Sequence, residues 1–125
     1  MQILLVDDSR LVRRYVARTL EMTGIDDLCI HEAGNGREAM VEVRKSKPDL
    51  IITDLNMPEM NGEELIACVA QDPDLRGIPI LVLSADRAEG KPEQLIHEGA
   101  IGYLTKPITP EDLRGRLLEL VGSNV

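Results

Sequence analysis

The sequence has very few aromatic side chains. It contains no Trp and no Phe, and its two Tyr residues are Tyr15 and Tyr103. A core without large rings has to be built from Leu, Ile, Val, Ala and Met, which suits helices packed on a parallel sheet. This composition favours an α/β fold, in which Tyr103 is an unusual residue.

Positive charge is also scarce, because 14 Lys and Arg face 22 Asp and Glu, a net charge of -8. Nucleic-acid phosphates are held by clustered Lys and Arg, so we expect this domain itself to bind no nucleic acid. No apolar run approaches the roughly 18 residues that a membrane-spanning helix needs, and the first residues lack the pattern of a signal peptide. We therefore expect a cytoplasmic protein without membrane contact.

Cysteine is limited to Cys29 and Cys68, and neither has a second Cys or a His at metal-binding spacing. The spacing indicates no zinc site and no redox pair. We expect both residues to be small buried hydrophobes.

What the chain does contain is a regular alternation of strand-like and helix-like segments. Its 125 residues suit one domain, which we predict over 1–125. Alternation of this kind indicates βα units around a parallel sheet. We expect strands over 3–6, 28–31, 50–53, 80–83 and 101–104. Helices should follow Ser9, end before Pro48 and near Pro73, form two turns around Leu95, and begin at Thr109-Pro110.

Polar residues gather directly after these predicted strands. Asp7 and Asp8 follow the first strand, Asp54 the third and Ser84 the fourth, and the fifth leads into Lys106. Reactive groups of open parallel sheets lie beyond the carboxyl ends of the strands, so these five residues should share one rim. We adopt, without deriving it, the flavodoxin-like strand order 2-1-3-4-5, which makes the first and third strands neighbours.

Three carboxylates at one rim would repel one another unless a cation neutralised them. The cluster offers oxygen ligands and no His or Cys, which favours Mg²⁺ over zinc, iron or copper. With a metal bound, Asp54 could attack phosphorus and form an acyl phosphate while Lys106 neutralises the phosphoryl oxygens. The hydroxyl of Ser84 could donate a hydrogen bond to one of those oxygens.

Four segments resemble, in order, the signatures of response-regulator receiver domains: LLVDDSRLVRR, DLNMPEMNGEEL, LSAD and GYLTKP. The resemblance covers nearly the whole chain. It implies a flavodoxin-like (βα)₅ three-layer sandwich and a CheY-like phosphoryl-accepting switch of a two-component system or phosphorelay. Such a domain is a phosphoacceptor with at most self-catalysed phosphorylation and dephosphorylation, and not a classical enzyme.

The same resemblance implies a role for each site residue. Asp54 would be the phosphoacceptor and would ligate Mg²⁺ directly together with Asp8, while Asp7 would act through a water. Asn56 would add its backbone carbonyl to the metal. Lys106 would pair with Asp54 or its phosphoryl group, through a loop containing a cis Lys106-Pro107 bond.

Signalling would depend on further positions. Ser84 and Tyr103 would be the switch pair, which changes the surface formed by the fourth helix, fifth strand and fifth helix. Asn56 and Asp86 stand where the family tunes the lifetime of the phosphoryl group. The donor would be a phosphohistidine on a partner histidine kinase or phosphotransfer protein, and the active form would bind a downstream protein target.

Simpler interpretations apply to several of these residues. Asp7 and Asp8 could cap the first helix, although Ser9 already suits that position. Asp54 and Lys106 could form a structural ion pair. His31 and His97 are interpreted as ordinary surface or edge residues, and Met57 and Met60 as loop packing.

The first helix carries four arginines: Arg10, Arg13, Arg14 and Arg18. We expect them to form a solvated face, with contact to a kinase partner as the alternative that the resemblance suggests.

Two other functions fit parts of the pattern. Asp54-Leu55-Asn56 after an apolar strand resembles the nucleophile of haloacid-dehalogenase-type phosphatases, but those enzymes usually have a second Asp where Asn56 stands and need a longer chain with a cap. A flavodoxin-like cofactor carrier would need a phosphate-binding loop after the first strand, where Asp7 and Asp8 would repel a phosphate.

Overall fold

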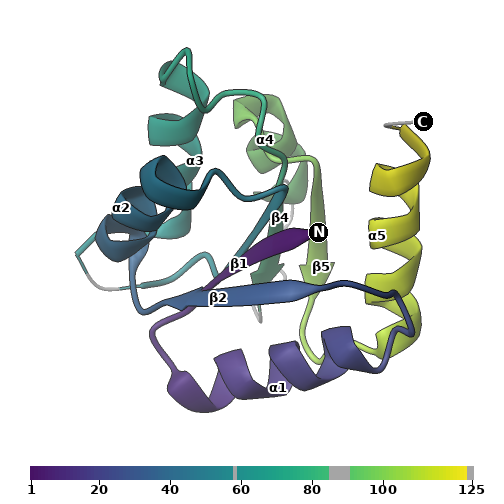
Figure 1. Ribbon diagram of the computed structural model, residues 1–125. Helices are drawn as coiled ribbons and strands as arrows, with labels where there is room; N and C mark the ends of the chain where they lie inside the picture. The colour runs from purple at the N-terminus through teal and green to yellow at the C-terminus, as the bar shows by residue number, and fades with distance from the viewer. Residues whose placement is uncertain (58, 85–90, 124–125) are drawn as a thin grey trace.

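The computed structural model describes residues 1–57, 59–84 and 91–123, and Figure 1 shows one sheet with helices on both faces. Five strands and five helices alternate along the chain. The strands are β1 (Gln2–Val6), β2 (Cys29–Ala33), β3 (Leu50–Thr53), β4 (Ile80–Ser84) and β5 (Gly102–Thr105). The helices are α1 (Arg10–Glu21), α2 (Gly36–Ser46), α3 (Gly62–Gln71), α4 (Lys91–Glu98) and α5 (Pro110–Ser123).

All neighbouring strands are parallel, and their order is β2-β1-β3-β4-β5. The predicted fold class is therefore confirmed. The central strands are buried on both faces, because successive side chains of a strand point to opposite sides of the sheet. In β1, Leu4 and Val6 enter one core cluster while Ile3 and Leu5 enter the other.

The two clusters define the layers of the sandwich. Apolar residues of α2, α3 and α4 cover one face of the sheet, and those of α1 and α5 cover the other (Figure 1). Leu65 and Leu95 belong to the first cluster, and Leu20 and Leu117 to the second. All four are fully buried. A core of this aliphatic kind is what the scarcity of aromatic residues predicts.

Helix starts follow the predicted capping residues. The Ser9 hydroxyl accepts a hydrogen bond from the Val12 N–H at 3.2 Å, which satisfies a free donor in the first turn of α1. The Thr109 hydroxyl does the same for Asp112 before α5. The chain before α3 forms a capping box, in which Asn61 and Glu64 each bond the other's backbone N–H.

The structural predictions that were wrong concern the burial of the two cysteines and the bounds of β2. Cys29 is exposed, because β2 is an edge strand and its first residue faces solvent. Cys68 is only half-buried against the core. On α1, Leu11 is 79% and Tyr15 is 51% exposed, so only some of the apolar residues of this helix enter the core. The strand β2 also lies one to two residues later in the chain than expected.

Within the described residues, no helix combines the length and apolarity that crossing a bilayer requires. Asp86 lies outside those residues.

Candidate functional site

Strand register brings the predicted site residues to one rim of the sheet. Val6 pairs with Thr53 at the ends of β1 and β3, so Asp7 and Asp54 follow neighbouring strands. The Asp54 N–H donates to the Val6 carbonyl at 2.9 Å and thereby extends this pairing past the strand ends. On the other side of β3, the Lys106 N–H donates to the Ser84 carbonyl at 2.9 Å.

The three acids predicted to form a cluster do meet. One carboxylate oxygen from each of Asp7, Asp8 and Asp54 lies within 4.8 Å of the other two. Asp7 is buried, Asp54 is partly buried and Asp8 is exposed. Every ligand atom in this group is a carboxylate oxygen, the donor type that Mg²⁺ prefers. The donor set therefore fits the predicted ion.

Asp7 is held at each of its polar atoms. Its N–H donates to the Ala33 carbonyl at 3.1 Å, and its Oδ1 accepts from the Ser9 N–H at 2.9 Å. Its Oδ2 accepts from Lys106 Nζ at 3.1 Å, and its carbonyl oxygen accepts from the Arg13 guanidinium at 2.6 Å. Burial removes a carboxylate from water, and such hydrogen bonds replace the lost hydration. Asp7 is thus built into the site and does not cap α1, which Ser9 does.

Asp54 has a different environment from Asp7. Its Oδ1 accepts from the Leu55 N–H at 2.8 Å and lies 3.7 Å from Lys106 Nζ. Burial raises the pKa of the Asp54 carboxyl above its usual range, and the nearby Lys106 ammonium opposes that rise. The Asp7 and Asp8 carboxylates add to it, because neighbouring negative charge disfavours ionisation. A cation bound beside Asp54 would offset this repulsion and favour the ionised carboxylate.

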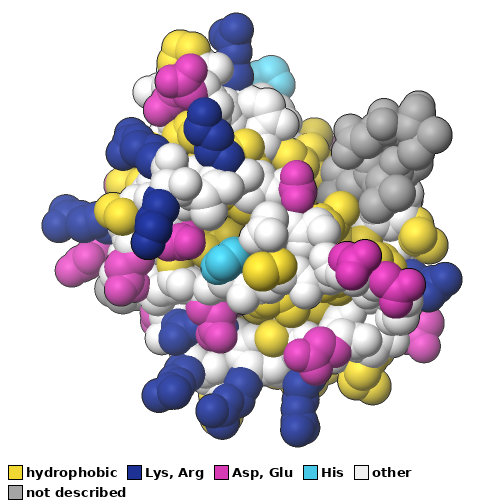
Figure 2. All heavy atoms as spheres, viewed as in Figure 1, with side chains coloured by type: hydrophobic (Ala, Val, Ile, Leu, Met, Phe, Trp, Pro, Cys, Tyr) yellow, Lys and Arg dark blue, Asp and Glu magenta, His cyan; other side chains and the backbone are white. Residues whose placement is uncertain are grey.

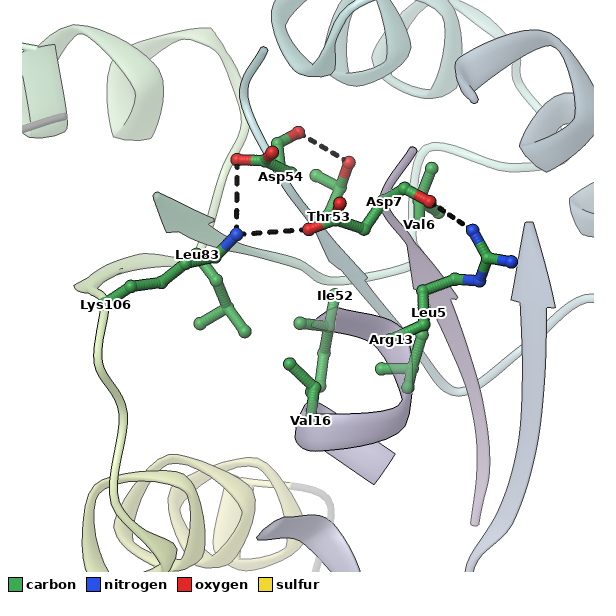
Figure 3. Close-up of a pocket in the computed structure, with 10 residues that line it drawn as sticks. All are labelled: Leu5, Val6, Asp7, Arg13, Val16, Ile52, Thr53, Asp54, Leu83 and Lys106. Carbon is green, nitrogen blue, oxygen red and sulfur yellow. Dashed lines mark hydrogen bonds and ion pairs between the residues drawn. The ribbon is translucent and has the colours of Figure 1, made fainter. Parts of the chain in front are cut away.

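Lys106 lies between two carboxylates and is closer to Asp7 (3.1 Å) than to Asp54 (3.7 Å). The predicted Lys106–Asp54 ion pair is therefore present as one half of a shared contact (Figure 3). The predicted cis Lys106-Pro107 bond is confirmed.

The predicted switch residues lie in the neighbouring strands. Ser84 ends β4 and is 1% exposed, and Tyr103 is a partly buried residue of β5 that packs against the cluster beneath α2, α3 and α4. Asn56 is exposed in the loop after Asp54. Met57 and Met60 pack against the same cluster, which agrees with their interpretation as loop packing.

Neither histidine joins the rim. His31 lies in the edge strand β2, where its Nε2 is 2.8 Å from the Gln2 side-chain oxygen, and His97 is exposed on α4.

Arg13 is the site residue that sequence reasoning missed. Arg10, Arg14 and Arg18 are exposed as expected, and Figure 2 shows basic side chains along the edge formed by α1. The side chain of Arg13 is only 16% exposed. It lines the pocket at the rim together with Asp7, Asp54 and Lys106 (Figure 3). A signal existed, since Arg13 lies three residues before the buried Val16 on α1, a spacing that shares a helix face.

Comparison with known proteins gives a consistent picture. The family model described as the response regulator receiver domain matches residues 3–118. The chemotaxis protein CheY1 of Helicobacter pylori is 34% identical over 125 residues, covering 99% of both chains. The phosphate regulon transcriptional regulatory protein PhoB of Pseudomonas aeruginosa is 38% identical over 115 residues, which are 92% of this chain and 49% of PhoB.

A solved structure agrees with these sequence matches. The chemotaxis protein CheY4 of Vibrio cholerae aligns with a TM-score of 0.83 and 35% identity, over 95% of this chain and 97% of that one.

Proposed function

The chain belongs to the response-regulator receiver family, and from this membership we propose that it is a Mg²⁺-dependent switch that accepts a phosphoryl group on Asp54. Receivers of this CheY-like kind are two-component signalling switches and not classical enzymes. The alternative of a haloacid-dehalogenase-type phosphatase is not supported, because the family model and the relatives are those of receivers. We take 1–125 as one receiver domain, of which the family model covers 3–118.

The observation that carries the proposal is the oxygen-only cluster beside Lys106. Asp8 and Asp54 would hold Mg²⁺ directly, with the Asn56 carbonyl as a third protein ligand. Both Asp7 oxygens already accept hydrogen bonds, at 2.9 Å from Ser9 and 3.1 Å from Lys106, which suits a role through a metal-bound water. When bound, the ion supplies positive charge next to the phosphoryl oxygens and lowers the repulsion among the carboxylates.

Phosphoryl transfer then follows from the residues present. A carboxylate oxygen of Asp54 forms the new bond to phosphorus, and the phosphorus–nitrogen bond of the donor phosphohistidine breaks with its electron pair going to the imidazole nitrogen. Lys106 would neutralise charge on the phosphoryl oxygens, and the Ser84 hydroxyl would donate a hydrogen bond to one of them. Self-catalysed phosphorylation and dephosphorylation would use the same residues.

The signal would leave the site through Ser84 and Tyr103. Ser84 is buried at the end of β4, and Tyr103 occupies the next strand with part of its side chain exposed. We propose that movement of the serine hydroxyl toward the phosphoryl group allows Tyr103 to turn inward. The surface of α4, β5 and α5 would change as a result and present a different face to a target.

A two-component switch needs a donor of the phosphoryl group and a target that recognises the phosphorylated form. A histidine kinase or phosphotransfer protein would supply the phosphoryl group, and a downstream protein would bind the phosphorylated form. We expect these encounters in the cytoplasm.

The test uses acetyl phosphate, or beryllofluoride as a phosphoryl analogue, with Mg²⁺ and the full chain. Wild type should gain one phosphoryl group by intact-mass spectrometry, and Asp54→Asn should gain none. Asp74→Asn, which removes an exposed acid far from the rim in sequence, should behave as wild type. Phosphorylation that survives in Asp54→Asn and maps to another residue would refute the proposal.

Metal binding gives a second test. Mg²⁺ competes with protons for the acidic cluster, so its affinity should fall as the pH drops through the raised pKa of Asp54. An affinity that does not change with pH, measured by calorimetry, would contradict a shared-carboxylate metal site.

A further inference from the structure

Arg13 contacts the acid cluster on the side away from Lys106. In Figure 3, Asp7 lies between the two cations, with its carboxylate toward Lys106 and its carbonyl toward Arg13. We propose that Arg13 is a positioning residue, which holds the Asp7–Asp8 peptide so that the Asp8 carboxylate faces Asp54 and can bind the metal. The inference rests on the proposed Mg²⁺ site and adds Arg13 to it, a residue that does not itself bind the metal.

The guanidinium of Arg13 is itself oriented by two elements. Its Nε donates to the Glu32 carboxylate of β2 at 2.8 Å, while its NH1 donates to the Asp7 carbonyl oxygen at 2.6 Å. The planar guanidinium presents these donors at fixed angles, which a lysine ammonium cannot do. With its side chain 16% exposed, Arg13 joins α1 to the ends of both β1 and β2.

Asp8 depends on this arrangement because no other described residue holds its side chain. Within the described residues, no hydrogen bond or ion pair involves the Asp8 carboxylate. The peptide that joins Asp7 to Asp8 is planar, so a contact that fixes its carbonyl also fixes the direction in which the chain enters Asp8. Arg13 therefore acts on the exposed Asp8 carboxylate through the backbone of the buried Asp7.

A role in charge alone would act in the opposite direction. A guanidinium near an anionic pocket repels Mg²⁺, so removing its charge would tighten metal binding. Removing a positioning contact would weaken binding. The sign of the change therefore separates the two roles, and only positioning predicts that a lysine restores part of the affinity.

The experiment measures Mg²⁺ binding to the full chain by calorimetry. Arg13→Gln should bind Mg²⁺ about tenfold more weakly than wild type, in the range that loss of a supporting contact costs a metal site. Arg13→Lys should lie between the two. Arg14→Gln makes the same change of charge at the next, exposed residue and should bind as wild type or slightly tighter. Equal or tighter binding by Arg13→Gln would overturn the proposal.

A metal-free measurement keeps this inference separate from the function on which it rests. Without Mg²⁺, the Asp8 amide should show faster motion by ¹⁵N relaxation in Arg13→Gln than in wild type or Arg14→Gln. An Asp8 amide with unchanged motion would contradict positioning even if affinity fell. If wild type binds no Mg²⁺, the proposed function fails, and the amide motion still decides the role of Arg13. Should Arg13→Gln not fold, Arg13→Lys and Glu32→Gln test the same contacts.

Discussion

The acceptor corner, which we define as Asp7, Asp8, Asp54, Leu55 and Gly62, differs sharply from the middle of α5 in how much room its backbone has. A Cβ atom added to Gly62 would overlap the Asp54 carbonyl oxygen and lie 3.0 Å from the Leu55 Cα. A Cβ added to Gly115 would meet no atom within 4 Å. Both glycines are helical, so the difference comes entirely from what lies beside the helix.

The close approach at Gly62 has a consequence for the site. The Gly62 N–H donates to the Leu55 carbonyl at 2.9 Å and closes the loop that carries Asn56 back onto the acceptor strand. Backbone packed on backbone leaves no flexible side chain to absorb a change. The corner therefore leaves no space for a side chain at Gly62, whereas α5 leaves space for one at Gly115. The following predictions test this difference, beginning with the largest expected effect.

Gly62→Ala should destabilise the protein by about 1 to 3 kcal/mol, since the added methyl group forces backbone to move. Urea unfolding followed by circular dichroism measures the change. The Asp54 carbonyl would be displaced directly, so Mg²⁺ affinity should fall as well. A variant as stable as wild type would show that the acceptor corner has spare room.

Tyr15→Phe tests the contact between α1 and the loop that precedes α5. The Tyr15 hydroxyl donates to the Ile108 carbonyl at 3.0 Å, two residues after Lys106. Loss of this hydrogen bond should cost about 1 kcal/mol of the free energy of unfolding. Arg14→Gln, on the same helix and without a side-chain hydrogen bond to any described residue, is the control. No loss of stability would mean that water replaces the carbonyl without cost.

Gly115→Ala should raise the free energy of unfolding by roughly 0.5 to 1 kcal/mol, because alanine loses less backbone entropy than glycine in a helix. The same urea titration detects it. Together with Gly62→Ala, this variant gives one chemical change with opposite signs at two places. Two losses of similar size would end the comparison between the corner and α5.

Asp54→Asn should change the free energy of unfolding least of these variants, by an amount that depends on pH. A raised carboxyl pKa means that the folded protein binds the proton more tightly than the unfolded chain, whose pKa is near 3.8. Wild-type stability therefore falls as pH rises from 3.8 through the raised value. Without divalent ions, Asp54→Asn should be the more stable form near neutral pH.

The gain from Asp54→Asn should shrink as pH drops through that window, and denaturant titrations at several pH values measure it. The Asp7 contact keeps Lys106 paired in the variant, at 3.1 Å, so the comparison is not confused by a freed cation. A stability difference that does not depend on pH would contradict a raised Asp54 pKa in the folded state.

Much of the fold was predictable because local sequence patterns indicate where its strands and helices lie. Apolar runs such as 50–53 match β3, and Ser9 and Thr109 mark the starts of α1 and α5. Predictions went wrong for the burial of Cys29 and Cys68, because exposure depends on which element covers a face. Residue propensity and hydrophobic periodicity indicate whether a segment is a helix or a strand, but they do not show what packs against it.

The order of polar residues after the strands was enough to predict which acids and which lysine share the rim, because parallel strands end on the same side of a sheet. The tertiary structure decided the partners. It placed Lys106 nearer to Asp7 than to Asp54, turned Arg13 inward to the Asp7 carbonyl, and left the Asp8 carboxylate without a hydrogen bond or ion pair among the described residues. Such choices depend on differences of about an ångström between chain segments far apart in sequence, and no local pattern encodes those distances.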